Sequence, residues 1–231
     1  MGSGTVPRGA QLTAIWHPSP NCGPRRNGAR PDMVVLHYTA IQSAEGARDW
    51  LCNPTAQVSA HYVIAPSGTL YQLVDEAERA WHAGAGAWGP LTDINSRSIG
   101  IEIANTGSTP FAAAQMDALD ELLSDILNRH AIPPERVIGH SDMAPGRKID
   151  PGPRFDWRRL ARRGLSVWPD PTGTDDFAAN ARIFGYTASA PPETMLHSFR
   201  MRFRPHASGP LDDTDRALMA DLANRWPVAG V

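Results

Sequence analysis

SIGIEI, the stretch from Ser98 to Ile103, decides the fold of this 231-residue chain. Its apolar residues alternate with other residues, which is the pattern of a β-strand. A second run, MVVL at residues 33–36, is apolar and rich in β-branched side chains, and it is typical of a buried strand that ends at His37. The two stretches predict a sheet, and the sequence around them indicates what covers it.

A long amphipathic helix is predicted after the first of these strands. Between Ala112 and His130, apolar residues recur at spacings of three and four, so that one face of the helix packs on a core. Strands interleaved with helices predict an α/β fold with a mixed central sheet flanked by helices. Further strands are predicted at 61–64, 70–73 and 137–139, and short helices at 44–51 and 156–163.

Composition divides the chain into two domains joined by a linker. Residues 1–168 are predicted to form the larger domain, in which residues 1–31, rich in Gly, Pro, Asn and Arg, form an irregular arm. Residues 169–174, PDPTGT, have the composition of a linker. Residues 175–231 show three short amphipathic helical patterns and predict a small three-helix domain.

The overall composition narrows the classes of partner. The chain is 42% apolar and 20% charged, and its formal net charge of −2 gives no global reason to expect nucleic acid as a partner. No apolar stretch is long enough to span a membrane, and the N-terminal residues lack the continuous apolar core of a secretory signal. We therefore expect a cytoplasmic monomer, with the periplasm or cell envelope as the alternative compartment.

The two cysteines, Cys22 and Cys52, do not form a CxxC motif. In a reducing compartment they are expected to be free thiols. A disulfide between them would require export of the protein.

Two histidines and an aspartate could hold a metal ion. His37 ends the predicted strand at 33–36, and His140 and Asp150 flank a loop rich in Pro and Gly that can fold back on itself. Together the three side chains offer two nitrogens and one oxygen, which is a common ligand set of catalytic zinc and leaves a fourth position for water. Taken alone, a histidine at the end of a strand, such as His37, is more often a structural residue than a metal ligand.

Glu102 and Lys148 are candidates for further chemistry. Glu102 lies in an otherwise apolar strand, where an unpaired carboxylate is costly, so it either forms an ion pair or faces a site and activates water. Lys148 precedes Asp150 by two residues and could stabilise an oxyanion, or it could be a solvent-exposed loop residue. The residues alone leave both alternatives open.

Five motifs, in order, resemble those of the zinc N-acetylmuramoyl-L-alanine amidases, which are related to animal peptidoglycan-recognition proteins. The matching stretches are VLHYT (35–39), VSAHY (58–62), AWHAG (80–84), SIGIE (98–102) and GHSDMAPGRKIDPGP (139–153). The resemblance covers about residues 15–165. It implies hydrolysis of the amide bond between the lactyl group of N-acetylmuramic acid and L-alanine in peptidoglycan or muropeptides, for cell-wall turnover or recycling.

The resemblance also implies roles for the candidate residues. His37, His140 and Asp150 would bind one Zn²⁺ per chain, Glu102 would be the general base and Lys148 the oxyanion stabiliser. One branch of the superfamily has a catalytic tyrosine immediately before the position of His61, where this chain has Ala60, so the chain is similar to the branch that relies on the glutamate.

Three more residues are candidate substrate contacts by this resemblance: His61, His82 and Arg147. His82 could line the substrate groove, whereas His61 is expected to pack or to form hydrogen bonds near the site. Residues 175–228 are similar to three-helix peptidoglycan-binding domains, through Phe184-Gly185-Tyr186 and the helix start at residues 211–214. Phe199 and Phe203 are expected to be core residues.

Two other functions compete with the amidase. A non-catalytic peptidoglycan-recognition protein could share the fold, but such receptors often lack a metal ligand, and here every position of the set is filled. A zinc peptidase or deacetylase is the second alternative. The chain has no HExxH motif, which is the commonest signature of zinc peptidases.

Overall fold

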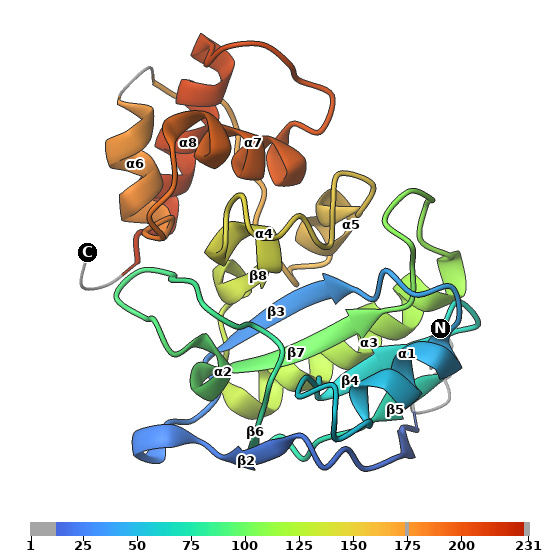
Figure 1. The fold of residues 1–231 in the computed structure, drawn as a ribbon. Helices are drawn as coiled ribbons and strands as arrows, with labels where there is room; N and C mark the ends of the chain where they lie inside the picture. The colour runs from blue at the N-terminus through green and yellow to red at the C-terminus, as the bar shows by residue number, and fades with distance from the viewer. Residues whose placement is uncertain (1–12, 174–175, 229–231) are drawn as a thin grey trace, which may run out of the picture.

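The computed structural model describes residues 13–173 and 176–228, and its centre is a six-stranded mixed sheet (Figure 1). The strands lie in the order β1-β5-β4-β7-β3-β8, and every neighbouring pair is parallel except β4 and β5. The predicted α/β fold with a mixed sheet is confirmed. The strands are Ile15–Trp16 (β1), Met33–Tyr38 (β3), Tyr62–Ile64 (β4), Leu70–Gln72 (β5), Ser98–Ile103 (β7) and Val137–Gly139 (β8).

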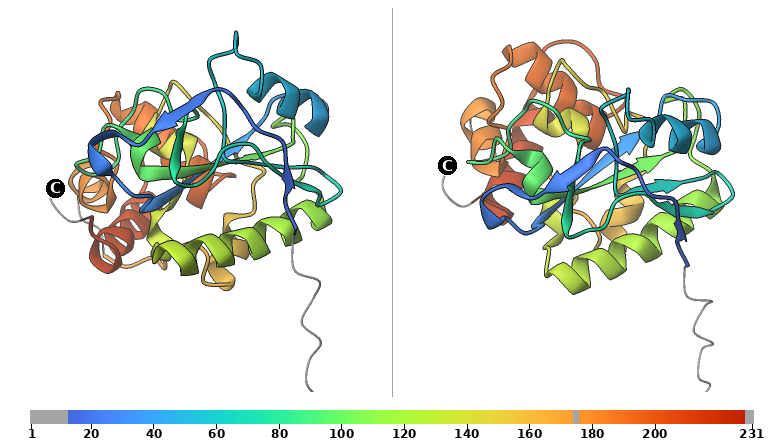
Figure 2. Two further views of the ribbon diagram at one scale, coloured as in Figure 1. Left: turned by 90° about the horizontal axis from the view of Figure 1, so that it is seen from below. Right: turned by 60° about the horizontal axis from the view of Figure 1, so that its bottom comes forward.

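The register of the central strands β3 and β7 sorts their side chains onto two faces. His37 is paired with Glu102, so the two side chains project from the same face of this parallel pair. The three isoleucines of SIGIEI project from the opposite face and pack against the helix α3 (Ala113–His130). Figure 2 shows α3 running along that face of the sheet. The long helix predicted from residue 112 is confirmed, and it begins one residue later.

Four shorter helices surround the rest of the sheet: α1 (Ala44–Leu51), α2 (Ile94–Arg97), α4 (His140–Met143) and α5 (Trp157–Arg162). Of these, α4 corrects the sequence interpretation, which placed a loop from residue 140 onward. The carboxylate of Asp142 accepts a hydrogen bond from the Gly139 N–H at 2.8 Å and so caps a single helical turn. This turn carries His140 at its start.

Residues 1–12 of the N-terminal arm lie outside the described residues, and residues 13–31 are more ordered than the sequence suggests. β1 pairs with β5 in the main sheet, and β2 (Cys22–Pro24) pairs with β6 (Glu78–Ala80) in a separate two-stranded sheet. A 3-10 turn, Arg26–Gly28, follows β2. These strands contain two and three residues, which is too short for an alternating pattern to be recognised. Cys22, which begins β2, and Cys52 are not joined by a disulfide in the structure.

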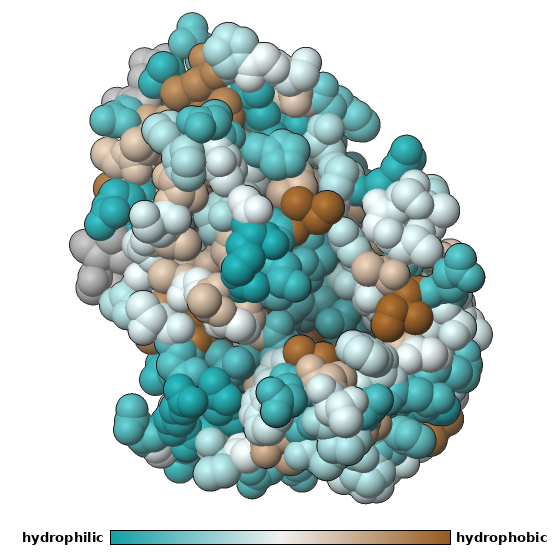
Figure 3. Space-filling view, viewed as in Figure 1, coloured by the Kyte–Doolittle hydropathy of each residue, from teal (hydrophilic) through white to brown (hydrophobic). Residues whose placement is uncertain are grey.

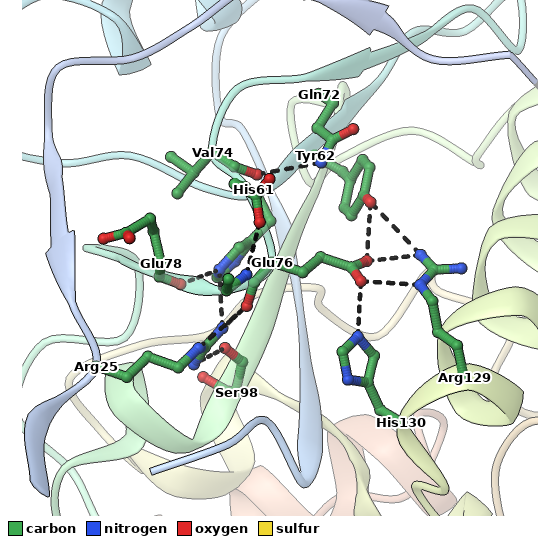
Figure 4. Close-up of polar contacts among 12 residues, drawn as sticks. Arg25, His61, Tyr62, Gln72, Val74, Glu76, Glu78, Ser98, Arg129 and His130 are labelled. Atoms are coloured by element: carbon green, nitrogen blue, oxygen red, sulfur yellow. Dashed lines mark hydrogen bonds and ion pairs between the residues drawn. The ribbon is translucent and has the colours of Figure 1, made fainter. Parts of the chain in front are cut away.

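Arg25 connects the N-terminal arm to the main-chain segments that precede β6 and β7 (Figure 4). Its buried guanidinium donates hydrogen bonds to the carbonyl groups of Glu76 at 2.9 and 3.1 Å, of Ser96 at 2.9 Å and of Ser98 at 3.1 Å. Burial removes water from the guanidinium, and the carbonyl groups accept its hydrogen bonds in place of that water. Arg25 therefore fixes the segment that leads into β7.

A second network in Figure 4, half-buried, is centred on the carboxylate of Glu76. It accepts hydrogen bonds from the Tyr62 hydroxyl at 2.8 Å, from Arg129 at 2.6 and 2.8 Å, and pairs with His130 at 2.6 Å. Burial alone would raise the pKa of Glu76, but the hydrogen bonds from Arg129, His130 and Tyr62 outweigh it and lower the pKa to about 2. The network joins the loop after β5 to the last turn of α3.

We expect the variant Glu76→Gln to be less stable than the wild type by roughly 2–3 kcal/mol at pH 7, somewhat less than the full equivalent of the pKa shift. Arg129 is 41% exposed, and solvent screening reduces its share. Because the folded pKa lies below the unfolded one, this stability is present above about pH 4.5 and is lost as the pH falls toward 2. Urea unfolding at pH 7 and pH 3 measures it. A difference from wild type that stays constant between these pH values, or an equal loss in the exposed-helix control Glu121→Gln, would contradict the assignment.

The C-terminal segment forms three helices, α6 (Phe177–Phe184), α7 (Pro192–Phe203) and α8 (Asp213–Arg225), at the top of Figure 1. Phe199 and Phe203 are buried core residues, as expected. Their hydrophobic cluster extends to Met33 and Val35 on β3 and to Trp88. The division into two domains stays a prediction, but the described helices share an apolar core with the sheet. None of the described helices is long and apolar enough to cross a membrane.

Candidate metal centre and active site

His37, His140 and Asp150 converge, although they come from β3, α4 and the loop after α4. The Nδ1 atoms of the two histidines are 2.9 Å apart, and Asp150 Oδ2 lies 2.8 Å from His37 Nδ1 and 3.0 Å from His140 Nδ1. All three side chains are buried. They are the group of possible metal ligands that the described part of the chain contains.

The tautomer of His140 follows from its other ring nitrogen. Nε2 lies 2.8 Å from the main-chain carbonyl oxygen of Ala83, which can only accept a hydrogen bond. The proton of the neutral ring is therefore on Nε2, and Nδ1 presents a lone pair to His37 and Asp150.

The tautomer of His37 follows from a chain of three hydrogen bonds. The Ser98 hydroxyl donates to the Ile94 carbonyl at 2.6 Å, so Ser98 Oγ accepts from His82 Nε2 at 3.1 Å. His82 Nδ1 then accepts from His37 Nε2, also at 3.1 Å. His37 Nδ1 therefore also carries a lone pair toward the centre.

The electrostatics of the three groups fit a cation. Burial and the neighbouring His140 lower the pKa of His37 to about 4, so its ring is neutral near pH 7. Two imidazole lone pairs and a carboxylate at such close range repel one another unless a cation neutralises them.

The donor set matches zinc better than the hard cations. Two imidazole nitrogens and one carboxylate oxygen are a common three-ligand set of catalytic zinc, whereas Ca²⁺ and Mg²⁺ prefer oxygen ligands alone. Ligands 2.0–2.1 Å from a tetrahedral ion lie about 3.3 Å apart. The sides of the observed triangle, 2.8–3.0 Å, are slightly shorter, so a small outward movement of the side chains would admit the ion.

Glu102 projects beside this triad from the neighbouring strand. Its Oε2 atom is shielded from solvent and has no hydrogen-bond partner among the described residues. Burial raises the pKa of Glu102 well above its usual range, and the negative charge of Asp150 adds to the effect. Glu102 forms no ion pair with any described residue, so the structure favours the interpretation in which it faces the site.

The triad lies in a cavity of about 750 Å³ between α1 and the loop that follows α4. Lys148 lies on its wall together with Glu102, so the two candidates for proton transfer and oxyanion stabilisation share one space. Figure 3 shows the hollow on this face, hydrophilic inside, with isolated hydrophobic residues at its rim. Val58 and Ile149 line the cavity and are 38% and 53% exposed.

The structure places the three candidate substrate contacts differently from one another. Arg147 lies at the cavity, where its guanidinium donates to the carbonyl groups of Ala83 and Ala85. His82 also borders the cavity, but its ring nitrogens are engaged by His37 and Ser98.

His61 lies away from the cavity and is fully buried. Its Nδ1 accepts from the Gly100 N–H at 3.0 Å, so its Nε2 donates to the Glu78 carbonyl at 3.2 Å. Burial and the adjacent Arg25 guanidinium lower the pKa of His61 to about 4. The packing role expected for His61 agrees with this position, and no surface of the side chain is left for a substrate.

Sequence reasoning missed the residues that lie behind the candidate metal ligands. Asn95 Oδ1 accepts hydrogen bonds from the main-chain N–H groups of His82 at 3.1 Å and Ala83 at 2.8 Å. Ser98 belongs to the stretch that decides the fold, and its polar side chain on the site-facing side of the strand was the available signal. Nothing in the local sequence distinguishes Asn95, because its partners are distant backbone groups.

A mixed sheet that carries a buried His-His-Asp triad, an unpaired glutamate and a lysine in one cavity is typical of metal-assisted hydrolases. Comparison with known proteins makes the assignment specific. A family model described as N-acetylmuramoyl-L-alanine amidase matches residues 27–153. The chain belongs to this family, so the predicted family and amidase activity are confirmed.

Known relatives span the chain to different extents. The N-acetylmuramoyl-L-alanine amidase AmiD of Escherichia coli K12 is 34% identical over 85% of this chain and 84% of AmiD. The 1,6-anhydro-N-acetylmuramyl-L-alanine amidase AmpD of Enterobacter cloacae is 33% identical over 62% of this chain and 86% of AmpD.

Solved structures of such amidases share the fold. E. coli AmiD in complex with anhydro-N-acetylmuramic acid-L-Ala-D-γ-Glu-L-Lys has a TM-score of 0.76 at 34% identity, covering 87% of this chain and 92% of that one. Pseudomonas aeruginosa AmpDh3 in complex with anhydromuramic pentapeptide has a TM-score of 0.77 at 31% identity, covering 88% and 95%. Both matches extend beyond the stretch that the family model covers.

Proposed function

We propose that the chain is a zinc-dependent N-acetylmuramoyl-L-alanine amidase in which His37, His140 and Asp150 hold one Zn²⁺. The observation that carries the proposal is the buried triangle of two imidazole lone pairs and one carboxylate oxygen. The scissile bond is the amide between the lactyl group of N-acetylmuramic acid and L-alanine. The names and bound molecules of AmiD and AmpDh3 support anhydromuropeptides as substrates.

Zinc bound to this triad would supply Lewis-acid chemistry, lowering the pKa of a water molecule and polarising the substrate carbonyl. The chain's own residues complete the reaction. The Glu102 carboxylate accepts the proton of the attacking water and delivers it to the departing amine of L-alanine. The Lys148 ammonium, on the same cavity wall, stabilises the negative oxygen that develops on the carbonyl.

The filled site favours an enzyme over a peptidoglycan receptor on the same fold. A receptor needs neither an unpaired buried carboxylate nor a metal triad, and both would lower its stability without a catalytic purpose. Among the described residues, Glu102 Oε2 has no hydrogen-bond partner, and this observation specifically favours catalysis.

We propose that the three C-terminal helices bind cell-wall material. A second cavity, of about 1070 Å³, lies between α6, α7 and the loop before α8. Apolar Phe177 and Leu196 line it together with the polar and charged side chains of Glu193, His197 and Arg200. Walls of this mixed character suit a ligand that has both sugar and peptide parts.

Removal of the metal should abolish the reaction. We expect dialysis against a chelator to reduce release of peptide from an anhydromuropeptide by at least about a thousandfold, because the polarised water is lost. One equivalent of Zn²⁺ should restore it, whereas Mg²⁺ should not. Mass spectrometry of the products locates the cut between sugar and peptide, and a parallel assay on intact sacculi compares polymeric wall with soluble fragments. Full activity in the chelated protein, or binding of the muropeptide without cleavage, would refute the proposal.

A further inference from the structure

One short segment contacts the outward-facing nitrogen of both histidine ligands. His37 Nε2 donates to His82 Nδ1 at 3.1 Å, and His140 Nε2 donates to the main-chain carbonyl of Ala83 at 2.8 Å. His82 and Ala83 are consecutive in the chain, whereas the two ligands are 103 residues apart. A contact on the remote nitrogen of a metal-binding imidazole fixes both its tautomer and its orientation.

The segment is itself held in place by two residues near the start of β7. The side-chain oxygen of Asn95 accepts from the N–H groups of both His82 and Ala83. Ser98 Oγ accepts from His82 Nε2 while its hydroxyl donates to Ile94, so His82 can offer only Nδ1 to His37. Asn95 and Ser98 are both buried.

Gly100 provides the space in which the His82 ring lies. A Cβ atom at residue 100 would be 2.4–2.7 Å from three atoms of the His82 ring, and these are its three nearest neighbours. The backbone of Gly100 is in β7 and is not in the left-handed region. The glycine in SIGIEI is therefore explained by the side chain that lies against it.

We propose that His82 and Ala83, held by Asn95 and Ser98, form the outer shell of the metal site and set both histidine ligands with Nδ1 toward the ion. His82 and Ser98 are thus positioning residues. The inference rests on the proposed function, because it assigns these contacts to metal binding. It goes further in giving His82 a task other than contact with the substrate.

The test measures the dissociation constant of Zn²⁺ by competition with a chromophoric chelator, alongside thermal unfolding of the metal-free protein. Ser98→Ala and Gly100→Ala should each weaken zinc binding by about 10–100-fold, the usual effect of losing an outer-shell partner. Ser96→Ala is the matched control, because Ser96 is a buried serine whose hydroxyl accepts from Arg26 N–H instead. Its zinc affinity should stay within about twofold of wild type.

A double-mutant cycle separates positioning from general damage to the fold. In the His82→Ala background, the clash at residue 100 is gone, so adding Gly100→Ala should weaken zinc binding no further. His82→Asn, whose amide oxygen can still accept from His37, should recover part of the affinity lost in His82→Phe. Metal-free unfolding temperatures should not follow this order.

Three results would overturn the inference while leaving the amidase intact. They are wild-type zinc affinity in Gly100→Ala, an equal loss in Ser96→Ala, and a further loss from Gly100→Ala in the His82→Ala background. A wild-type protein that binds no zinc would instead refute the proposed function itself, so the two failures are distinguishable.

Discussion

Glu102→Gln is expected to lower kcat by roughly 10²–10⁴-fold while leaving one zinc per chain, because a positioned general base contributes about that much. Glutamine has nearly the shape of glutamate but cannot accept the proton of the attacking water. The buried Glu102 Oε2 has no hydrogen-bond partner among the described residues, so its replacement breaks no contact that the structure shows. Turnover of a muropeptide, measured beside zinc content and urea unfolding, gives the three required values.

The outcome for Glu102 is interpretable because activity should fall without a loss of stability. Because burial already favours the uncharged form of Glu102, its replacement by neutral glutamine should leave the free energy of unfolding unchanged or higher. The surface variant Glu121→Gln should keep the wild-type kcat. If Glu102→Gln retains more than about half of the wild-type kcat with zinc bound, the base is another group.

Arg202→Met is expected to lower the free energy of unfolding by about 3–5 kcal/mol, the usual cost of breaking a buried ion pair from one side. Arg202 on α7 pairs with the Asp142 carboxylate of α4 at 2.7 Å, and both side chains are buried. Its guanidinium also donates to the Val137 carbonyl at 3.0 Å and lies over the Trp157 ring. Removing it leaves the charge of Asp142 buried without a cation.

Two companion variants test the reason for this effect. Arg225→Met removes an arginine that is 42% exposed and pairs with Asp221 on the same helix, and it should cost less than about 1 kcal/mol. In the double variant Asp142→Asn, Arg202→Met, no uncompensated charge remains, so part of the lost stability should return. Urea unfolding measures all three, and a loss below about 1 kcal/mol in Arg202→Met alone would contradict the buried-pair assignment.

The sequence was informative wherever a repeating pattern or a specific motif was present. The alternation in residues 98–103 and the helical spacing after residue 112 correspond to observed elements. The grouping of His37, His140 and Asp150 could be predicted because two imidazoles and one carboxylate are a known ligand set of catalytic zinc, and because the surrounding motifs resemble those of the amidase family. Its convergence in space is now observed.

What could not be read from the sequence depends on contacts between distant segments. Arg202 appears in the sequence as one of several charged residues on an amphipathic helix, and only the packing of α7 against α4 places it beside Asp142. The family resemblance suggests only that His82 lines the substrate groove. The hydrogen bond to His37 depends on the space over Gly100, which no periodicity indicates.

The contacts that orient His37 and His140 differ in how easily a mutation removes them, because one is made by a side chain and the other by the main chain. His140 is held by a main-chain carbonyl, which every amino acid at residue 83 would still provide, so side-chain exchange there can disturb the contact only by moving the backbone. His37 is held by the side chain of His82, which a single codon change removes. Random mutagenesis should therefore find loss-of-metal variants with most replacements of His82, but at residue 83 only with side chains too large for the fully buried position of Ala83.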